Sequence, residues 1–187
     1  MPKNLDELDL KILKSLTEDC RKSTTQVAKE ANTTRPTAIA RINHLVEEGI
    51  VDFGAKVNVT KLGLKLATIH FEARQGQSTD EILSALEKCP RIVQLIQLTG
   101  KPVFTALMVV EDANTLLSSI ERMSSTLNIN VVSYQRVLPL IGETFSMKIS
   151  PEKHDLTPCG NDCRLCLSYQ QNECLGCPSS SFYKGQI

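Results

Sequence analysis

Residues 5–49 carry the signals of three consecutive helices joined by short turns, and this pattern constrains the fold more than any other feature. In the first segment, LDELDLKILKSL, the apolar residues recur at helical spacing. They are Leu5, Leu8, Ile12, Leu13 and Leu16. The sequence therefore predicts an amphipathic first helix whose apolar face packs on the helices that follow.

Two further helices are marked by their capping residues. Ser23 and Gln26 form the pattern of a capping box, in which each side chain bonds the other residue's backbone amide. Asn32 follows the short second helix, and asparagine accepts the left-handed backbone that a tight turn needs. Thr34 is a good N-cap for a third helix, which Gly49 ends. The order predicts a helix-turn-helix.

The segment after these helices, IVDFGAKVNV at residues 50–59, alternates between apolar and other residues. We expect a two-stranded ribbon with its bend at Gly54, which is the wing of a winged helix-turn-helix. An ordinary three-helix bundle is the alternative, and binary patterning alone does not separate the two. The short second helix, the turn chemistry and the ribbon favour a DNA-binding domain over residues 1–60.

The third helix has an apolar stripe and a polar side. The stripe consists of Ala38, Ile39, Ile42, Leu45 and Val46. Arg and His side chains can donate to guanine, Asn can pair with adenine, and Lys suits phosphate contacts that fix the register. The predicted DNA-binding residues are Lys22, Ser23, Thr34, Arg35, Thr37, Arg41, Asn43, His44 and Lys56.

The segments LDELDLKIL, DCRKSTTQVAKEANTT and RPTAIARINHLVEEGIV resemble the N-terminal domain of the Lrp/AsnC family, the feast/famine regulators of bacteria and archaea. The resemblance runs from about Leu5 to Phe145, although the family usually has glycine where this chain has Asn32. It implies a regulator of transcription that binds double-stranded DNA as a homodimer. It also implies assembly of dimers into rings such as octamers.

Residues 61–148 alternate strand and helix patterns in the order βαββαβ. The expected strands are 65–73, 92–98, 103–110 and 129–141, and the expected helices are 78–89 and 112–126, opened by Ser78 and Asp112. This order predicts a ferredoxin-like domain with helices on one face of an antiparallel sheet, so the fold class is α+β. The apolar strands suggest that the other face is also covered, and a second copy of the chain would cover it.

The resemblance extends to an effector-binding role for this second domain. In the family, the turn after the second strand commonly reads Gly-Asp-Tyr-Asp, and amino acids bind near it. Here the turn is Gly100-Lys101-Pro102-Val103, which lacks a carboxylate to meet an ammonium group. Gly100 and Lys101 are the candidate effector residues, and whether a small molecule binds there stays open.

A cysteine-rich tail over residues 159–187 follows a linker at 149–158. Its thiols have the spacing C-x3-C-x2-C-x7-C-x2-C and belong to Cys159, Cys163, Cys166, Cys174 and Cys177. Short gaps let two thiolates converge on one metal, and thiolates suit zinc and iron–sulfur clusters equally well. A bound metal could sense metal or redox state, or could be purely structural in so short a module.

One other interpretation of the tail cysteines remains open at this point. The tail could be a redox switch with two disulfides and one spare thiol. Cys20 and Cys89 stand alone in the sequence, and we expect them to be small, partly buried side chains. The closing segment carries Phe182 and Tyr183, which could pack on the tail or contact the transcription machinery.

Composition sets limits on function. The net charge is zero, which argues against non-specific coating of nucleic acid. No apolar run is long enough to span a bilayer and no signal segment leads the chain, so we expect a cytoplasmic protein without membrane partners.

Siroheme decarboxylases share the two-domain architecture and supply an enzyme alternative. The chain has no tryptophan and no evident catalytic pair, so we expect no catalytic residues and a regulator rather than an enzyme.

Overall fold

A computed structural model describes residues 5–138, 144–149 and 152–185. The chain forms two compact units, Met1–Ala55 and Lys56–Ile187. Within the described residues, no helix is both long enough and apolar enough to cross a lipid bilayer.

The first unit is a bundle of three helices, as the sequence predicts. They are α1 (Glu7–Glu18), α2 (Thr24–Glu30) and α3 (Arg35–Glu47). Ile12, Val27 and Leu45, one from each helix, form the centre of its buried apolar cluster. Val46 was expected in the apolar stripe but is 41% exposed, because one step along a helix turns a side chain by about 100° from its neighbour Leu45.

The strand pair expected around Gly54 is not formed. Residues 51–56 have neither helix nor strand, and β1 (Val57–Asn58) pairs instead with β6 (Thr144–Phe145). The predicted segment contributes a strand only at Val57–Asn58, and the partner of that strand comes from far along the chain. The prediction of a local ribbon was therefore wrong.

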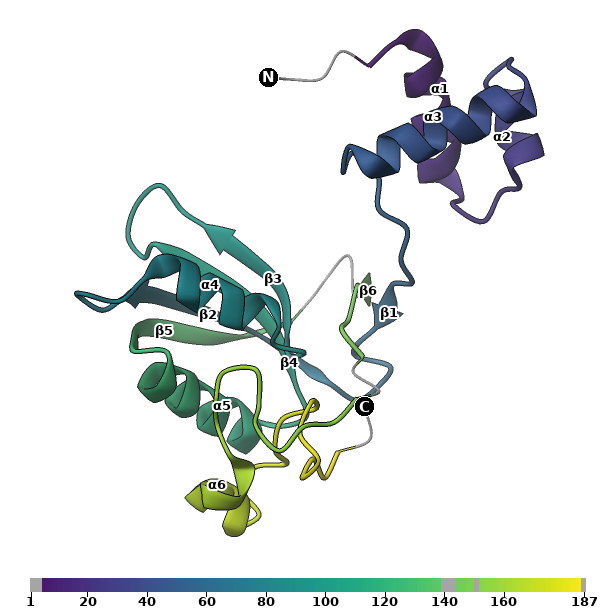
Figure 1. Cartoon of the computed structure of the whole chain (residues 1–187). Helices are drawn as coiled ribbons and strands as arrows, with labels where there is room; N and C mark the ends of the chain where they lie inside the picture. The colour runs from purple at the N-terminus through teal and green to yellow at the C-terminus, as the bar shows by residue number, and fades with distance from the viewer. Residues whose placement is uncertain (1–4, 139–143, 150–151, 186–187) are drawn as a thin grey trace. The chain divides into compact units, whose positions relative to one another are not determined.

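The second unit contains the predicted βαββαβ order. Its elements are β2 (Lys65–Ala73), α4 (Thr79–Glu87), β3 (Ile92–Gln97), β4 (Phe104–Val110), α5 (Ala113–Thr126) and β5 (Ile129–Val137) (Figure 1). The strands lie in the order β3-β4-β2-β5, and every neighbouring pair is antiparallel. Asp112 caps α5 by accepting from the Thr115 amide, at 2.7 Å. Ser78 stands at the N-cap of α4, but its side chain makes no capping bond. The end of the last expected strand, residues 139–141, lies outside the described residues.

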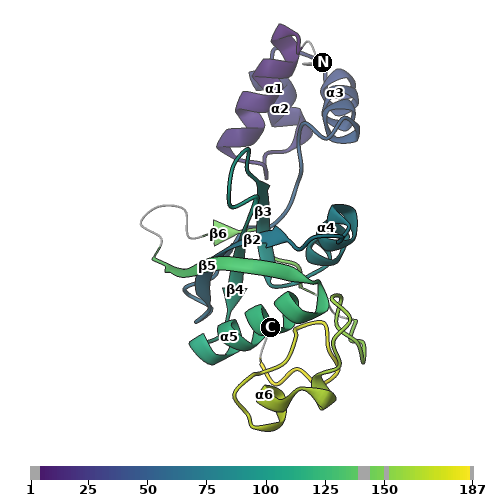
Figure 2. The ribbon, with the colours of Figure 1, turned by 90° about the vertical axis from the view of Figure 1, so that its left-hand side faces the viewer.

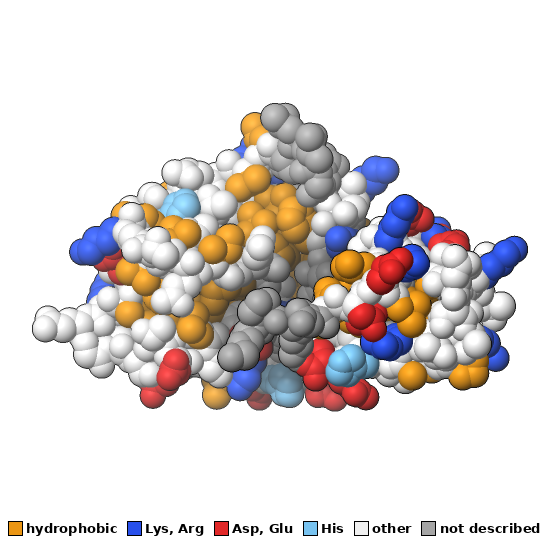
Figure 3. Space-filling view, turned by 90° about the horizontal axis from the view of Figure 1, so that it is seen from above, with side chains coloured by type: hydrophobic (Ala, Val, Ile, Leu, Met, Phe, Trp, Pro, Cys, Tyr) orange, Lys and Arg blue, Asp and Glu red, His pale blue; other side chains and the backbone are white. Residues whose placement is uncertain are grey.

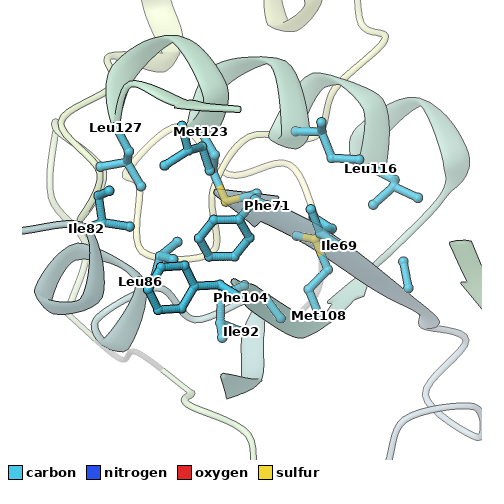
Figure 4. Close-up of a cluster of buried hydrophobic side chains, with 14 of the residues drawn as sticks. Ile69, Phe71, Ile82, Leu86, Ile92, Phe104, Met108, Leu116, Met123 and Leu127 are labelled. Atoms are coloured by element: carbon cyan, nitrogen blue, oxygen red, sulfur yellow. The ribbon is translucent and has the colours of Figure 1, made fainter. Parts of the chain in front are cut away.

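Helices α4 and α5 cover one face of this sheet. Phe71 of β2 and Phe104 of β4 stack at its centre with their ring centroids 5.3 Å apart (Figure 4). Leu86 of α4 and Met123 of α5 are buried in the same cluster. Alternate residues of the strands therefore point into one core, as the period of a pleated strand requires.

The opposite face of the sheet is partly covered by the chain itself. Val59 and Leu64 pack there against Val109, together with segment 144–147. Beyond this cover the face is mixed: His70 bonds Thr105 through Nδ1 at 2.9 Å, next to an exposed Ile96. Hydrophobic side chains also gather on the surface of this unit in the view of Figure 3.

The tail adds two short elements, the 3-10 helix η1 (Cys163–Leu165) and α6 (Leu167–Gln170). It lies beside α5 in both ribbon views (Figures 1 and 2). Thr126 at the end of α5 donates a hydrogen bond to Asn161 at 2.9 Å. Part of the predicted linker joins the tail, since His154 forms a bridge with Ser180; residues 150–151 lie outside the described residues.

Candidate functional site

The helix-turn-helix is built by the capping residues that the sequence indicates. Ser23 and Gln26 form a complete capping box at the start of α2. Asn32 takes the left-handed backbone with φ 54°, and Thr34 caps α3 by accepting from the Thr37 amide. These bonds satisfy amides that the first turn of a helix leaves without partners, so they fix where α3 begins.

Most of the predicted DNA-binding side chains are exposed on or beside α3. Arg35, Thr37, Asn43 and His44 are all exposed. The Arg35 Nε donates to the Thr24 hydroxyl at 3.3 Å, a weak bond that a nucleic-acid acceptor could replace. The exposed side of α3 therefore offers donors of the kinds that read base edges or bind phosphates.

Arg41 is held by two carboxylates at the start of α1. Its guanidinium lies 2.8 Å from Asp6 and 3.2 Å from Asp9, whose side chain is 6% exposed. The Asp9 amide donates to Asp6 and lowers the pKa of that carboxyl, and the charge of Arg41 lowers it as well. Arg41 thus joins α3 to the capping box of α1, a structural role that the sequence pattern did not reveal.

Lys22 is also engaged within the protein. Its ammonium lies 2.8 Å from Glu30 and 3.1 Å from Glu18. The bond to Glu30, followed by the bond to Glu18, raises the pKa of Lys22. Its charge is therefore largely compensated locally. Lys56 is exposed and belongs to the second unit.

The candidate effector residues lie on a turn between β3 and β4. Gly100 and Lys101 are both exposed. Neither lines the cysteine-lined cavity described below. Their role in binding an effector stays a prediction.

The tail is docked on the sheet unit through a buried arginine. Arg91 directly precedes β3 and is 5% exposed. It forms an ion pair with Glu111 at 2.6 Å and donates to the Gly176 carbonyl. Tyr183 near the end of the tail donates its hydroxyl to the same Glu111. Gly176 has φ 85°, and a Cβ there would meet both backbone and the Tyr169 ring at 3.3 Å. Glycine is therefore needed at this docking point.

The docking forms a partly open cavity of about 70 Å³ between α5, the end of α4 and the tail. All five predicted cysteine ligands line it, and Cys89 lines it as well. The described thiols are free, with no disulfide among them. Cys89 is not among the ligands predicted from the sequence, because 69 residues separate it from the tail and no local motif surrounds it.

Burial makes several of these thiols hard to ionise without a cation. Desolvation, reinforced by the nearby thiols of Cys89 and Cys159, raises the pKa of Cys177 to about 12. It also raises the pKa of Cys89 and of Cys174. A bound metal ion would favour the thiolate and offset this cost.

The neighbouring thiols that help to raise the pKa of Cys177 are Cys89 and Cys159. Those that help to raise the pKa of Cys174 are Cys166 and Cys163. In the part of the chain that the structure describes, no three His, Cys, Asp or Glu side chains converge closely enough to hold a single metal ion. His154 is exposed and does not line the cavity.

Comparison with known proteins gives two kinds of match. Residues 5–52 match the family model described as winged helix-turn-helix DNA-binding. The HTH-type transcriptional regulator Ptr1 of Methanocaldococcus jannaschii is 29% identical over 147 residues, which cover 78% of this chain and 99% of Ptr1. An uncharacterized HTH-type transcriptional regulator of Pyrococcus furiosus is 32% identical over 120 residues, 62% of this chain and 81% of that protein.

The fold has a counterpart among solved structures. The feast or famine regulatory protein of Mycobacterium tuberculosis, complexed with L-methionine, superposes with a TM-score of 0.67 at 20% identity. The match covers 81% of this chain and 99% of that protein. Because Ptr1 and the tuberculosis protein are matched almost completely, the rest of this chain has no counterpart in them. The predicted α+β fold, a helix-turn-helix followed by a ferredoxin-like domain, is confirmed.

Proposed function

Because the chain belongs to the Lrp/AsnC family of helix-turn-helix transcription regulators, we propose that two copies present α3 to neighbouring turns of one DNA duplex. The relatives are regulators of transcription and not enzymes, so the decarboxylase alternative is set aside. The exposed polar side of a well-capped α3 is the observation that carries the proposal. A helix held in this way inserts its first turns into the major groove.

The proposed contacts fall into two groups. Arg35, Thr37, Asn43 and His44 are exposed and can meet bases or phosphates, although Thr37 must give up a 2.8 Å bond between its hydroxyl and that of Thr34. Arg41 must break its bonds to Asp6 and Asp9 before it can contact DNA, and this cost reduces its net contribution to the free energy of DNA binding. Ser23, Thr34, Lys22 and Lys56 are proposed as phosphate contacts that position the helix.

Binding by two helix-turn-helix domains requires a homodimer, which we propose forms through the sheet unit. The open face of the sheet carries Ile96 together with the His70–Thr105 pair, a mixed surface suited to an interface between identical copies. Two copies related by a twofold axis would give each α3 an equivalent half-site. Dimers could assemble further into octamers.

We also propose that the tail thiols bind zinc or an iron–sulfur cluster and that occupancy changes DNA affinity. Five tail cysteines line one cavity beside α5, and they carry this part of the proposal. The tuberculosis protein holds L-methionine. In this chain the Gly100–Lys101 turn offers no carboxylate for an amino acid's ammonium group, so the tail is the better candidate for the sensing element.

The DNA-binding proposal is tested with a duplex that the protein itself selects from a random-sequence pool. Arg35→Ala should weaken binding by about 1–3 kcal/mol, or roughly 5- to 150-fold, if it reads a base. Arg74→Ala is the matched control, because Arg74 is an exposed arginine of the sheet unit. Equal affinity for the wild type and Arg35→Ala would count against α3 as the reading helix. Light scattering that finds only monomers at micromolar concentration would overturn the dimer.

A further inference from the structure

We propose that the cavity holds a polynuclear iron–sulfur centre, and that Cys89 of the sheet domain belongs to its thiol shell along with the tail cysteines. This inference rests on the proposed metal binding by the tail. The new elements are the class of cofactor and a thiol from the sheet domain. The bound centre would therefore link the tail to the sheet.

The thiols reach the cavity from three separate places in the chain. Cys89 follows α4. Cys159 precedes η1, Cys163 begins it and Cys166 follows it, and Cys174 and Cys177 lie on either side of Gly176. Helix α5 closes the cavity with Met123 and Arg122 among others. A centre bound here would be enclosed by protein on several sides, as buried clusters are.

The room between the thiols favours a cluster over one zinc ion. A tetrahedral zinc site holds four ligands about 2.3 Å from the metal, which places its sulfur atoms roughly 3.8 Å from one another. No three candidate ligands in the described segments converge in that manner. The six thiols instead surround a space of about 70 Å³, whereas a single water needs about 10–15 Å³ on the same measure. A cluster of several atoms fits that space better than one ion does.

The sulfur atoms already receive hydrogen bonds of the kind that tune a cluster. The Asn161 side-chain amide donates to Cys159 Sγ at 3.2 Å, and the Gly176 backbone amide donates to Cys174 Sγ at 3.4 Å. Donors to cysteine sulfur stabilise the negative charge of a thiolate-bound cluster and set its potential. The buried Arg91 and the half-buried Arg122 add positive charge to the wall.

Cys89 gives the centre a mechanical connection to the sheet. Its backbone amide donates to the Leu86 carbonyl at the end of α4, and its carbonyl accepts from the Ile92 amide at the start of β3. Two residues on, Arg91 bonds both Glu111 and the tail's Gly176. A change at the centre that moves Cys89 is therefore transmitted to α4 and β3 as well as to the tail.

The test is reconstitution of the full-length protein with ferrous iron and sulfide without oxygen. We expect iron and acid-labile sulfide in equal amounts, at two or more atoms of each per chain, with a brown colour. Cys89→Ser should lose at least half of the iron or lose it several times faster to a chelator. Cys20→Ser is the control, since Cys20 is exposed in the DNA-binding unit, and it should load as the wild type does.

Different outcomes test the iron–sulfur centre and metal binding by the tail separately. One zinc per chain, bound in preference to iron and sulfide, would overturn the cluster while the metal-binding tail stands. A fully loaded and stable Cys89→Ser protein would remove Cys89 from the shell. Failure of wild-type protein to bind either zinc or iron would overturn metal binding by the tail itself.

A second measurement does not depend on a variant that folds. Metal-free wild-type protein is oxidised gently with diamide, digested and mapped by mass spectrometry. We expect a disulfide from Cys89 to Cys159 or Cys177 in the metal-free protein and its suppression after reconstitution. Disulfides confined to the tail would contradict the placement of Cys89.

Discussion

The DNA-binding unit and the cysteine tail are both small, but different forces hold them. The first has three capped helices around a shared apolar cluster with Ile12 and Leu45 at its centre. The tail has only one turn each of η1 and α6, and its buried residues include Ser179, Ser180 and three thiols. A module with so little apolar core depends on docking and on ligands for its order. The comparison predicts that the two regions respond to different perturbations.

The largest effect is expected at the docking arginine. Arg91→Ala removes the cation that balances the largely buried Glu111 carboxylate and leaves it only the Tyr183 hydroxyl, so the free energy of unfolding of the sheet unit should fall by about 3–5 kcal/mol. Chemical denaturation measures the loss. The double variant Arg91→Ala/Glu111→Ala should lose less than the sum of the two single variants, and a single variant as stable as the wild type would show that the pair does not hold the tail.

The matching change in the other region is Ile12→Ala, at a side chain with no exposed surface. It should destabilise the three-helix unit by about 2–5 kcal/mol and abolish DNA binding. Metal content per chain should not change, because the thiols belong to the other unit. Leu10→Ala is the control on the same helix, since Leu10 is 54% exposed; a loss of metal in Ile12→Ala would break the separation of the two regions.

A smaller effect is expected at the cap of α3. Thr34→Ala removes the side-chain oxygen that receives the Thr37 amide, and it should cost about 0.5–2 kcal/mol in stability. Thermal unfolding measures the shift, with the exposed Thr25→Ala as the control. Equal midpoints for the two variants would contradict the capping role.

The smallest effect depends on pH. The Asp9 amide and Arg41 lower the pKa of Asp6 in the folded protein, so its stabilising effect is present above the usual pKa of about 3.9. That effect is lost as the pH falls through the lower pKa of the folded state. Asp6→Asn should therefore lower the unfolding midpoint near about pH 7, and the difference should shrink once the pH is low enough to protonate the Asp6 carboxyl of the folded protein. A constant difference across this range would exclude the carboxylate charge as its cause.

Local signals made most of the fold predictable from the sequence. The capping box of Ser23, the turn at Asn32 and the βαββαβ order depend on neighbours within a few residues, and each is present in the structure. The ribbon at Gly54 was wrong because β1 finds its partner in β6, far along the chain. The bonds from Arg41 to Asp6 likewise connect distant helices, and no periodicity encodes them.

The candidate thiol site likewise combines residues that local spacing predicts with one that only a distant contact brings in. The five tail cysteines were apparent from their short spacing, and the structure brings all five to one cavity. Cys89 was not apparent, because only the docking of the tail through Arg91 brings it there. Local spacing identifies the ligands that one turn can bring together, whereas tertiary docking selects the rest.

The most direct test of the account compares the DNA affinity of one protein in two states. Fluorescence anisotropy with the self-selected duplex, at fixed salt and without oxygen, measures the dissociation constant of metal-loaded and metal-stripped protein. The account predicts at least a fivefold difference, and DNA should change metal retention by the same factor because the coupling is reciprocal. Equal dissociation constants for two folded, dimeric samples would contradict a sensing role for the tail.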